Sequence, residues 1–390
     1  MTTKALDKKY IAGTYSRFDL ELVRGEGSMV YDSEGKGYID LGTGIAVNTF
    51  GQDKEWIRAV TEQLEKIQHT SNLYYASPMA LLAEMLCKRT GAKKVFFGNS
   101  GAEANECAIK VARKWALDNK GEGYHNIITL KNSFHGRTIT TLAATGQDVF
   151  HTNFGPFPEG FLYAEANNID DVTSLVKANG CCAVMIELVQ GEGGVIALDK
   201  DYVKALCELC EREGLLLIVD EVQTGNGRSG ELYAFQAYGI KPDVVTTAKG
   251  LGGGLPIGAC MMFDKTYSTL TPGTHGSTFG GNPIACAGAL NIISRINRRV
   301  LNGVKLRSEY IFNELRGAVG IKSVSGLGLM IGIETTADAS KIIAECIKRG
   351  ILPLKAKNKI RLLPALNIPM PLLKRAIKTI KEVAEEFANE

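Results

Sequence analysis

Long apolar runs and a net charge of one sign are both missing from this sequence. No stretch approaches the roughly 20 apolar residues needed to cross a bilayer, and the N-terminal residues MTTKALDKKYIAGTYSRFD lack the apolar core of a signal peptide. The 45 Lys and Arg residues nearly balance the 42 Asp and Glu residues, so the formal net charge is only +3. We therefore expect neither nucleic acid nor a membrane as a partner.

Histidine is scarce, and the cysteines are not arranged as a framework. The five histidines share no ligand spacing with each other or with cysteines, so no metal site is expected. Nine cysteines, an odd number, fall mostly within apolar periodic segments, which favours free thiols in a reducing cytoplasm. Cys207 and Cys210 form a C-x-x-C, but apolar positions 203, 206, 207 and 210 share one helical face, which indicates core packing.

The middle of the chain alternates short apolar runs with amphipathic segments. The apolar runs are 95–97, 127–130, 183–189, 215–219 and 243–247, and helical patterns such as AEANECAIKVARKWA separate them. This alternation predicts an α/β fold with a mostly parallel sheet that is covered by helices on both faces. We expect a large domain over residues 51–285, a smaller α+β domain over 286–390, and an N-terminal segment 1–50 that packs with the smaller domain.

Unusual polar residues follow each of these predicted strands. The strands lead into GNSGAEAN, KNSFHGR, QGEGG, DEVQ and AKG, in chain order. In open parallel sheets, ligands bind at the carboxyl ends of the strands. Five strands that deliver such residues to one edge predict a ligand site there.

Lys249 and Asp220 are the two strand-end residues whose chemistry is most specific. Lys249 stands between an apolar run and a cluster of glycines; it is either an ordinary surface lysine or a buried amine that attacks a carbonyl. Asp220 ends the apolar run LLLIV, so it either caps a turn or pairs with a cationic ligand nitrogen. Gln223 can reach the same ligand if the chain turns helically.

Ser100 and Glu103 fit a capping box at the start of a predicted helix. The neighbouring Gly101 and Ala102 are small, and a helix N-terminus favours a phosphate, so this is either a plain helix cap or a phosphate site. A lysine, an aspartate and such a helix start are together the parts that a pyridoxal phosphate site requires.

The segment Gly225–Gly230 reads GNGRSG, which formally matches the dinucleotide fingerprint G-x-G-x-x-G. Residues 220–224 separate it from the preceding strand, and no acidic residue ends a strand about 20 residues later. An NAD-dependent oxidoreductase is therefore a remote alternative. Arg137 and Arg361 are candidate carboxylate clamps, since guanidinium matches carboxylate geometry; Arg361 could instead be a solvent-facing residue of an edge strand.

At these residues the sequence resembles the class III, fold-type I, pyridoxal-phosphate aminotransferases over nearly its whole length. The resemblance depends on motifs that occur in order: RFDLELVRGEG, GIAVN, HTSNLYY, NSGAEANE, FHGRT, QGEGGV, DEVQTGNGRSG, AKGLGGGLPIGA and HGSTFGGNP. It implies a large domain with a mostly parallel, seven-stranded sheet. It also implies pyridoxal 5'-phosphate as the cofactor and a homodimer as the active unit.

The resemblance assigns the cofactor contacts by motif. Lys249 would form the Schiff base and move the proton between substrate and cofactor, Asp220 would pair with the pyridine nitrogen, and Gln223 would contact the ring hydroxyl. Phe134 would stack on the ring. The phosphate would bind Ser100, Gly101, Ala102 and, from the neighbouring subunit, Thr278.

The resemblance also assigns a substrate pocket. Arg137 would hold the donor's α-carboxylate, and Arg361 a carboxylate of the acceptor, with Glu192 pairing with Arg361 when the acceptor is absent. Further pocket residues would be Ser277, Tyr15, Gly44 and Asn72.

Gly44 stands where related ornithine δ-aminotransferases typically have tyrosine, which leaves room for an acylated α-amino group. We therefore expect N2-acetyl-L-ornithine and 2-oxoglutarate as substrates, in a step of arginine biosynthesis. The alternatives are ornithine, succinylornithine, N-acyl-lysine or 4-aminobutyrate as donor, or a pyridoxal-phosphate aminomutase. Two departures from the family pattern, GQDKE at 51–55 and ELVQGE at 187–192, affect local loop geometry.

Overall fold

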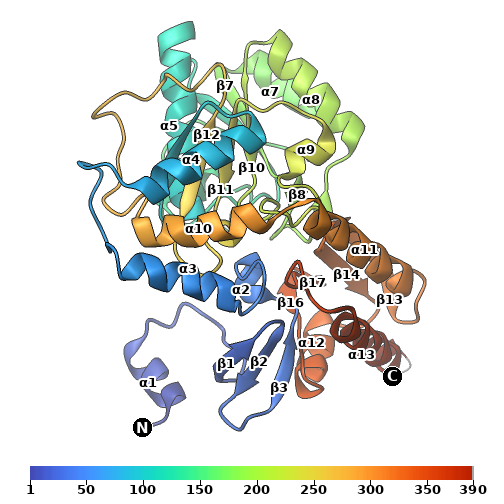
Figure 1. Cartoon of the computed structure of the whole chain (residues 1–390). Helices are drawn as coiled ribbons and strands as arrows, with labels where there is room; N and C mark the ends of the chain where they lie inside the picture. The colour runs from blue at the N-terminus through green and yellow to red at the C-terminus, as the bar shows by residue number, and fades with distance from the viewer. Residues whose placement is uncertain (389–390) are drawn as a thin grey trace.

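The computed structural model describes residues 1–388, and its centre is a seven-stranded sheet (Figure 1). The β12 strand is antiparallel to both of its neighbours, and the other neighbouring pairs are parallel. The fold is therefore α/β with a mostly parallel sheet, as predicted. In spatial order the strands are β4 (Lys94–Gly98), β12 (Gly258–Met262), β11 (Val244–Thr247), β10 (Leu216–Asp220), β7 (Cys181–Ile186), β5 (Asn126–Leu130) and β6 (Phe161–Ala164).

Helices cover both faces of this sheet because its central strands are buried on both sides. On one face, α5 (Gly101–Lys120) packs Ala104, Cys107, Ala108 and Val111 toward the strands. On the other face lie α4 (Ser77–Thr90), α7 (Ile169–Ala178), α8 (Lys200–Arg212) and α10 (Pro283–Arg295). Cys207 and Cys210 belong to this second core as free thiols, so the core-packing interpretation of the C-x-x-C is confirmed.

A second sheet lies in the C-terminal part of the chain. Its four antiparallel strands are β13 (Ile321–Leu327), β14 (Met330–Thr335), β17 (Lys359–Leu362) and β16 (Leu354–Ala356), in that order. Three helices pack with it, namely α11 (Arg298–Leu315), α12 (Ala339–Lys348) and α13 (Met370–Ala388).

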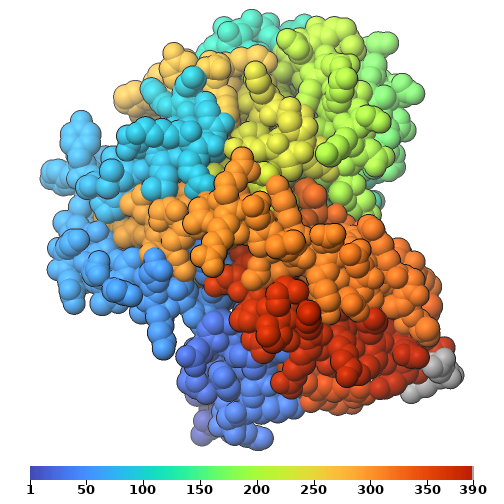
Figure 2. All heavy atoms as spheres, turned by 45° about the vertical axis from the view of Figure 1, so that its right-hand side comes forward, coloured from blue at the N-terminus to red at the C-terminus, as the bar shows by residue number. Residues whose placement is uncertain are grey.

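The N-terminal strands join the C-terminal part through a third sheet. The strands β1 (Leu22–Glu26), β2 (Met29–Asp32) and β3 (Gly37–Asp40) form an antiparallel set, and β15 (Ile351–Leu352) pairs with β3 in parallel. Figure 2 shows these N-terminal residues, in blue, beside the C-terminal residues, in red. The domain limits at residues 50 and 285 stay a prediction.

The remaining elements connect these sheets. They are α1 (Thr3–Tyr10), α2 (Thr43–Ala46), α3 (Lys54–Leu64), α6 (Ile139–Ala144), α9 (Ala234–Tyr238), and the short pair β8 (Val189–Gln190) and β9 (Ile196–Ala197). Among the described residues, no helix is long and apolar enough to cross a membrane.

Candidate active site

A cavity of about 450 Å³ opens at the carboxyl ends of the central strands. Its wall comes from the segments that follow β4, β5, β7, β10 and β11, the same five strands that the sequence predicts to deliver polar residues to one edge. Parallel neighbours end at the same edge, so residues far apart in sequence meet there. The cavity thus collects Ser100, Phe134, Glu187, Asp220 and Lys249.

Lys249 follows β11 after one residue, Ala248, and begins a single 3-10 turn. Its backbone is left-handed, with φ at 43°, and its side chain lies in the cavity wall. Burial lowers the pKa of the Lys249 amine, although the nearby carboxylates of Glu192, Asp220 and Glu187 oppose that effect. A larger neutral fraction makes the amine a better nucleophile toward a carbonyl.

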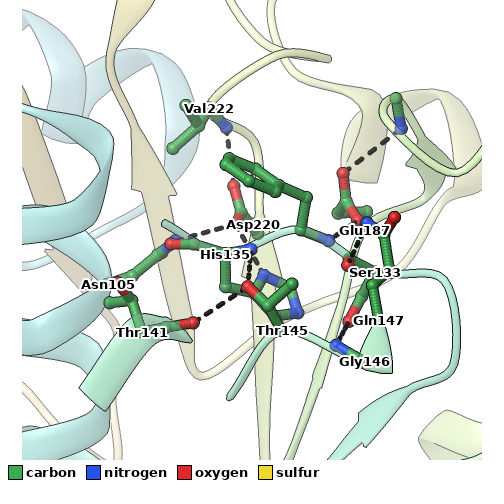
Figure 3. A network of polar contacts seen from close by, with 12 residues as sticks. Asn105, Ser133, His135, Thr141, Thr145, Gly146, Gln147, Glu187, Asp220 and Val222 are labelled. Carbon is green, nitrogen blue, oxygen red and sulfur yellow. Dashed lines mark hydrogen bonds and ion pairs between the residues drawn. The ribbon is translucent and has the colours of Figure 1, made fainter. Parts of the chain in front are cut away.

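Asp220 is buried at the end of β10 and has three hydrogen-bond donors (Figure 3). Its Oδ2 accepts from Asn105 Nδ2 and from His135 Nδ1, both at 2.8 Å, and its Oδ1 accepts from the Val222 N–H at 3.0 Å. Because a carboxylate only accepts, His135 carries its proton on Nδ1. These donors fix the orientation of the carboxylate, which can face a cationic ligand nitrogen.

Ser100 caps α5 as predicted, since its Oγ accepts from the Glu103 N–H at 3.1 Å. The reciprocal contact differs from a standard capping box, because Glu103 Oε2 accepts from the Asn99 N–H instead of the Ser100 N–H. A Cβ on Gly101 would lie 2.7 Å from Cγ1 of Val222, so glycine permits this close packing. The first turn of α5 faces the cavity and offers its free N–H groups to an anion.

Phe134 and Arg137 line the cavity from the segment after β5. The Phe134 N–H donates to Oε2 of Glu187 at 2.9 Å, which fixes the backbone beneath the ring. Arg137 is exposed, and its guanidinium carbon lies 4.2 Å from the centroid of the Phe150 ring. The same carbon lies 5.4 Å from the centroid of the Phe134 ring. Arg137 forms no ion pair with the described residues, so its charge is available to a ligand.

Arg361 lies in β17, which pairs with β14 on one side and β16 on the other. It is therefore an interior-strand residue, and its side chain is 3% exposed, which excludes the solvent-facing alternative. Its Nη1 lies 2.6 Å from Glu192 Oε1 and 3.3 Å from Gln223 Oε1. Burial would raise the pKa of Glu192, but the charge and hydrogen bond of Arg361 outweigh it and hold that pKa below its usual value.

Seven of the expected residues lie outside the cavity lining of one chain, namely Tyr15, Gly44, Asn72, Glu192, Ser277, Thr278 and Arg361. Asn72 Nδ2 donates to the carbonyl oxygens of Ser277 and Gly280 at 3.0 and 2.9 Å. The Ser277 hydroxyl accepts from Asn99 Nδ2 at 3.1 Å, which joins this loop to the start of α5. Tyr15 and Thr278 are exposed.

Gly44 lies in an unusual left-handed turn. Thr43, Gly44, Ile45 and Ala46 all have positive φ, and φ of Gly44 is 64°. A Cβ on Gly44 would have its nearest neighbours at 3.7 and 3.9 Å, so space remains around this position.

Among the cavity residues that the sequence analysis did not single out are Asn105, His135, Glu187 and Val222. Each of them stands inside one of the motifs NSGAEANE, FHGRT, ELVQGE and DEVQ. Asn105 is one helical turn beyond Gly101. The i,i+4 spacing of an α-helix could have placed Asn105 on the same side of α5 as Gly101. The directions of the other three depend on loop conformation, which no short-range pattern encodes.

Comparison with known proteins relates nearly the whole chain to the aminotransferases. The profile of the family Aminotransferase class-III matches residues 10–384. The acetylornithine aminotransferase of Haemophilus ducreyi is 48% identical over 387 residues, covering 98% of both chains. That of Caldanaerobacter subterraneus subsp. tengcongensis is 42% identical over 389 residues, again covering 98% of both.

Solved structures agree with this result. The ornithine aminotransferase of Toxoplasma gondii, which has pyridoxal phosphate at partial occupancy in its active site, superposes with a TM-score of 0.94 at 30% identity. The match covers 99% of this chain and 94% of that one. The N-acetylornithine aminotransferase of Stenotrophomonas maltophilia has a TM-score of 0.85 and 34% identity, with 99% of both chains covered.

The residues present fit pyridoxal phosphate. A partly desolvated amine, a carboxylate held by three donors and a helix N-terminus meet in one cavity, and Phe134 and Val222 supply apolar walls for a flat ring. The chain belongs to the class III aminotransferases, whose cofactor is pyridoxal phosphate.

Proposed function

We propose that the enzyme moves the terminal amino group of N2-acetyl-L-ornithine to 2-oxoglutarate. The products are N-acetylglutamate 5-semialdehyde and glutamate, and the reaction serves arginine biosynthesis. The observation that carries this proposal is the 42–48% identity to acetylornithine aminotransferases along 98% of the chain. Arg137 is available to bind the α-carboxylate of the donor, and Arg361 is available to bind a carboxylate of the acceptor.

Each cofactor contact is assigned to a residue whose place in the cavity suits it. Lys249 would bond to the cofactor aldehyde, Asp220 would face the pyridine nitrogen, and the start of α5 from Ser100 to Ala102 would hold the phosphate. Bound pyridoxal phosphate supplies an electron sink for the substrate carbanion. The Lys249 amine would take the proton from the substrate carbon, for which its lowered pKa suits it. Gln223 is assigned to the ring hydroxyl.

Arg361 and Glu192 separate the two half-reactions. In the donor half-reaction Glu192 neutralises Arg361, so the site offers one free guanidinium, that of Arg137. In the acceptor half-reaction Glu192 gives way to a carboxylate of 2-oxoglutarate. One site can then accept a substrate with one carboxylate and a substrate with two.

Gly44 is the residue to which we assign the preference for an acylated donor. The nearest atoms to a Cβ at this position lie 3.7 Å away, so a small residue leaves open space around it. Tyr15, Asn72 and Ser277 are assigned to the same pocket.

We also propose a homodimer in which Thr278 of one subunit completes the phosphate site of its partner. Thr278 is exposed and lies outside the cavity of its own chain. Large apolar side chains are exposed in its vicinity and in the segment that Asn72 ties to it, including Leu73, Tyr75 and Phe279. Exposed apolar surface of this kind is typical of a protein interface. The nine free cysteines favour the cytoplasm.

A panel of amino donors with 2-oxoglutarate tests the substrate assignment, with glutamate formation as the measurement. We expect the highest kcat/KM for N2-acetyl-L-ornithine, and lower values for ornithine, succinylornithine, N-acyl-lysine and 4-aminobutyrate. A higher kcat/KM for any of these would reassign the donor. Turnover without any 2-oxo acid would indicate an aminomutase.

A further inference from the structure

Glu187 is a buried carboxylate of the cavity wall for which the assignments above give no role. It follows β7 directly and is 6% exposed. Its Oε2 accepts from the Phe134 N–H at 2.9 Å, and its Oε1 accepts from the Gly191 N–H at 3.3 Å (Figure 3). One side chain therefore connects two loops that are 57 residues apart in sequence, counted from 134 to 191.

These two loops carry different residues of the proposed substrate site. The first carries Phe134 and Arg137. The second runs from Gly191 into Glu192, whose carboxylate pairs with Arg361. Gly191 is also packed closely, since a Cβ there would lie 2.7 Å from Nε2 of Gln223. The position of Glu192 thus depends on a backbone that Glu187 holds.

We propose that Glu187 is a positioning residue that ties the Glu192 loop to the Phe134 loop, and that its charge sets how strongly Glu192 competes with the acceptor for Arg361. This inference deepens the proposed function and rests on it for the identity of the acceptor. The hydrogen bonds themselves do not depend on that identity.

The ionised form of Glu187 can serve both N–H groups, and the protonated form serves them unequally. A carboxylate accepts on both oxygens, whereas the hydroxyl oxygen of a carboxylic acid is a weak acceptor. The longer contact, to Gly191, is the one that protonation weakens first. A looser Glu192 competes less well for Arg361, and a neutral Glu187 also repels an anionic substrate less.

Glu187 is placed to change its charge near neutral pH. Burial raises its pKa to about 7, with Asp220 adding to the effect, while His135 and the Phe134 and Gly191 N–H groups oppose it. The charged and titratable groups that face it are His135 after β5, Asp220 at the end of β10 and Lys249 after β11.

The variant Glu187→Gln tests the proposal, because the amide keeps one acceptor for Phe134 and turns a donor toward Gly191. We expect KM for 2-oxoglutarate to fall about threefold at pH 8, within the range by which a residue that contacts neither ligand modulates coupled sites. In the unaltered enzyme this KM falls as pH drops from 8 to 6. In Glu187→Gln we expect it to stay constant over that range.

Glu221→Gln is the matched control, since Glu221 is also buried with a pKa raised to about 7 by burial, yet it does not line the cavity. It accepts from the Phe235 N–H at 2.7 Å and from the Thr224 hydroxyl instead. We expect Glu221→Gln to keep the pH dependence of KM. Equal pH dependence in Glu187→Gln and Glu221→Gln would overturn the proposal.

Hydrogen exchange on the cofactor-free protein gives a second measurement that needs no turnover. In Glu187→Gln we expect the Gly191 amide to lose protection while the Phe134 amide keeps it, and in Glu221→Gln neither should change. Unchanged protection at Gly191 would overturn the positioning role. If 2-oxoglutarate proves not to be a substrate, the proposed function fails and the exchange result still decides whether Glu187 holds this loop.

Discussion

Arg361 and Glu192 lie 169 positions apart in sequence, yet their Nη1 and Oε1 atoms are 2.6 Å apart in the structure. Arg361 comes from the sheet β13-β14-β17-β16, whereas Glu192 follows the short strand β8 beside the central sheet. The Nε atom of Arg361 has no hydrogen-bond partner among the described residues. The guanidinium thus has an exchangeable carboxylate partner and unused donor capacity, as an acceptor clamp requires.

Replacing Arg361 by alanine should impair the acceptor half-reaction selectively. A hydrogen bond to a charged group contributes about 1.5–3 kcal/mol, so we expect kcat/KM for 2-oxoglutarate to fall about tenfold to a hundredfold. Cofactor binding should fall much less, because Arg361 reaches the proposed ring contacts only through its 3.3 Å hydrogen bond to Gln223. Single-turnover kinetics of the two half-reactions, with cofactor titration of the free protein, measure both. Equal losses in the two would make Arg361 a structural residue.

Lys249 should be the residue that becomes covalently linked to the cofactor. Borohydride treatment of the loaded enzyme, followed by peptide mapping, should place the cofactor on the peptide that contains Lys249. Lys249→Ala should abolish turnover while the protein remains folded, because a half-buried amine contributes little to packing. A label on another lysine would remove Lys249 from the chemistry.

Gly44→Tyr should reduce turnover of N2-acetylornithine more than turnover of free ornithine. The side chain would fill the space that surrounds Gly44, whose nearest neighbours lie 3.7 Å or more from a Cβ. Because φ is 64° at this position, any side chain adds strain of about 1 kcal/mol. Gly44→Ala measures that strain alone. If Gly44→Tyr and Gly44→Ala show the same ratio of kcat/KM for the two donors, Gly44 does not select the donor.

The central sheet could be predicted from sequence where its strands are continuous apolar runs, and not elsewhere. LLLIV and DVVTT are rich in β-branched and aliphatic residues, as strands buried on both faces require. The β12 strand reads GACMM and β6 reads FLYA, and neither contains a β-branched residue. The pairing of β15 with β3 joins residues more than 300 positions apart, and no local pattern encodes such a pairing.

In the proposed site, too, some residues could be placed from the sequence pattern and others could not. Lys249, Asp220 and Ser100 stand within three positions of the ends of predicted strands, so the parallel sheet alone brings them to one edge. His135 and Glu187 are also near strand ends, but their roles depend on which way a loop turns its side chains. Their contacts to Asp220 and to Phe134 appear only once the loops are folded.

Removing the His135 imidazole should weaken cofactor binding. Its Nδ1 is one of three donors to Asp220, and a hydrogen bond to a carboxylate contributes about 1.5–3 kcal/mol. We expect His135→Ala to raise the Kd of pyridoxal phosphate about tenfold to a hundredfold, measured by titration of the cofactor-free protein. His135→Gln can still donate one hydrogen bond and should recover part of the affinity. An unchanged Kd in His135→Ala would show that the other two donors suffice.

The buried carboxyls should make the free energy of unfolding depend on pH in a definite direction. Burial raises the pKa of Glu221 from 4.5 to about 7, so the folded protein binds this proton more tightly than the unfolded chain does. The resulting stabilisation is fully present below pH 4.5 and is lost as pH rises through about 7. At 1.36 kcal/mol per pH unit, the loss is on the order of 3 kcal/mol.

Urea unfolding of the cofactor-free protein at pH 5.5 and pH 8 measures this effect in Glu221→Gln against the unaltered protein. The glutamine cannot titrate, so the fall in the free energy of unfolding between these two pH values should be smaller in the variant. Glu187 contributes a fall of the same sign, because burial raises its pKa to about 7 as well, and Glu187→Gln should reduce the slope similarly. An unaltered slope in Glu221→Gln would mean that its carboxyl stays ionised in the folded protein, held by the Phe235 N–H and the Thr224 hydroxyl.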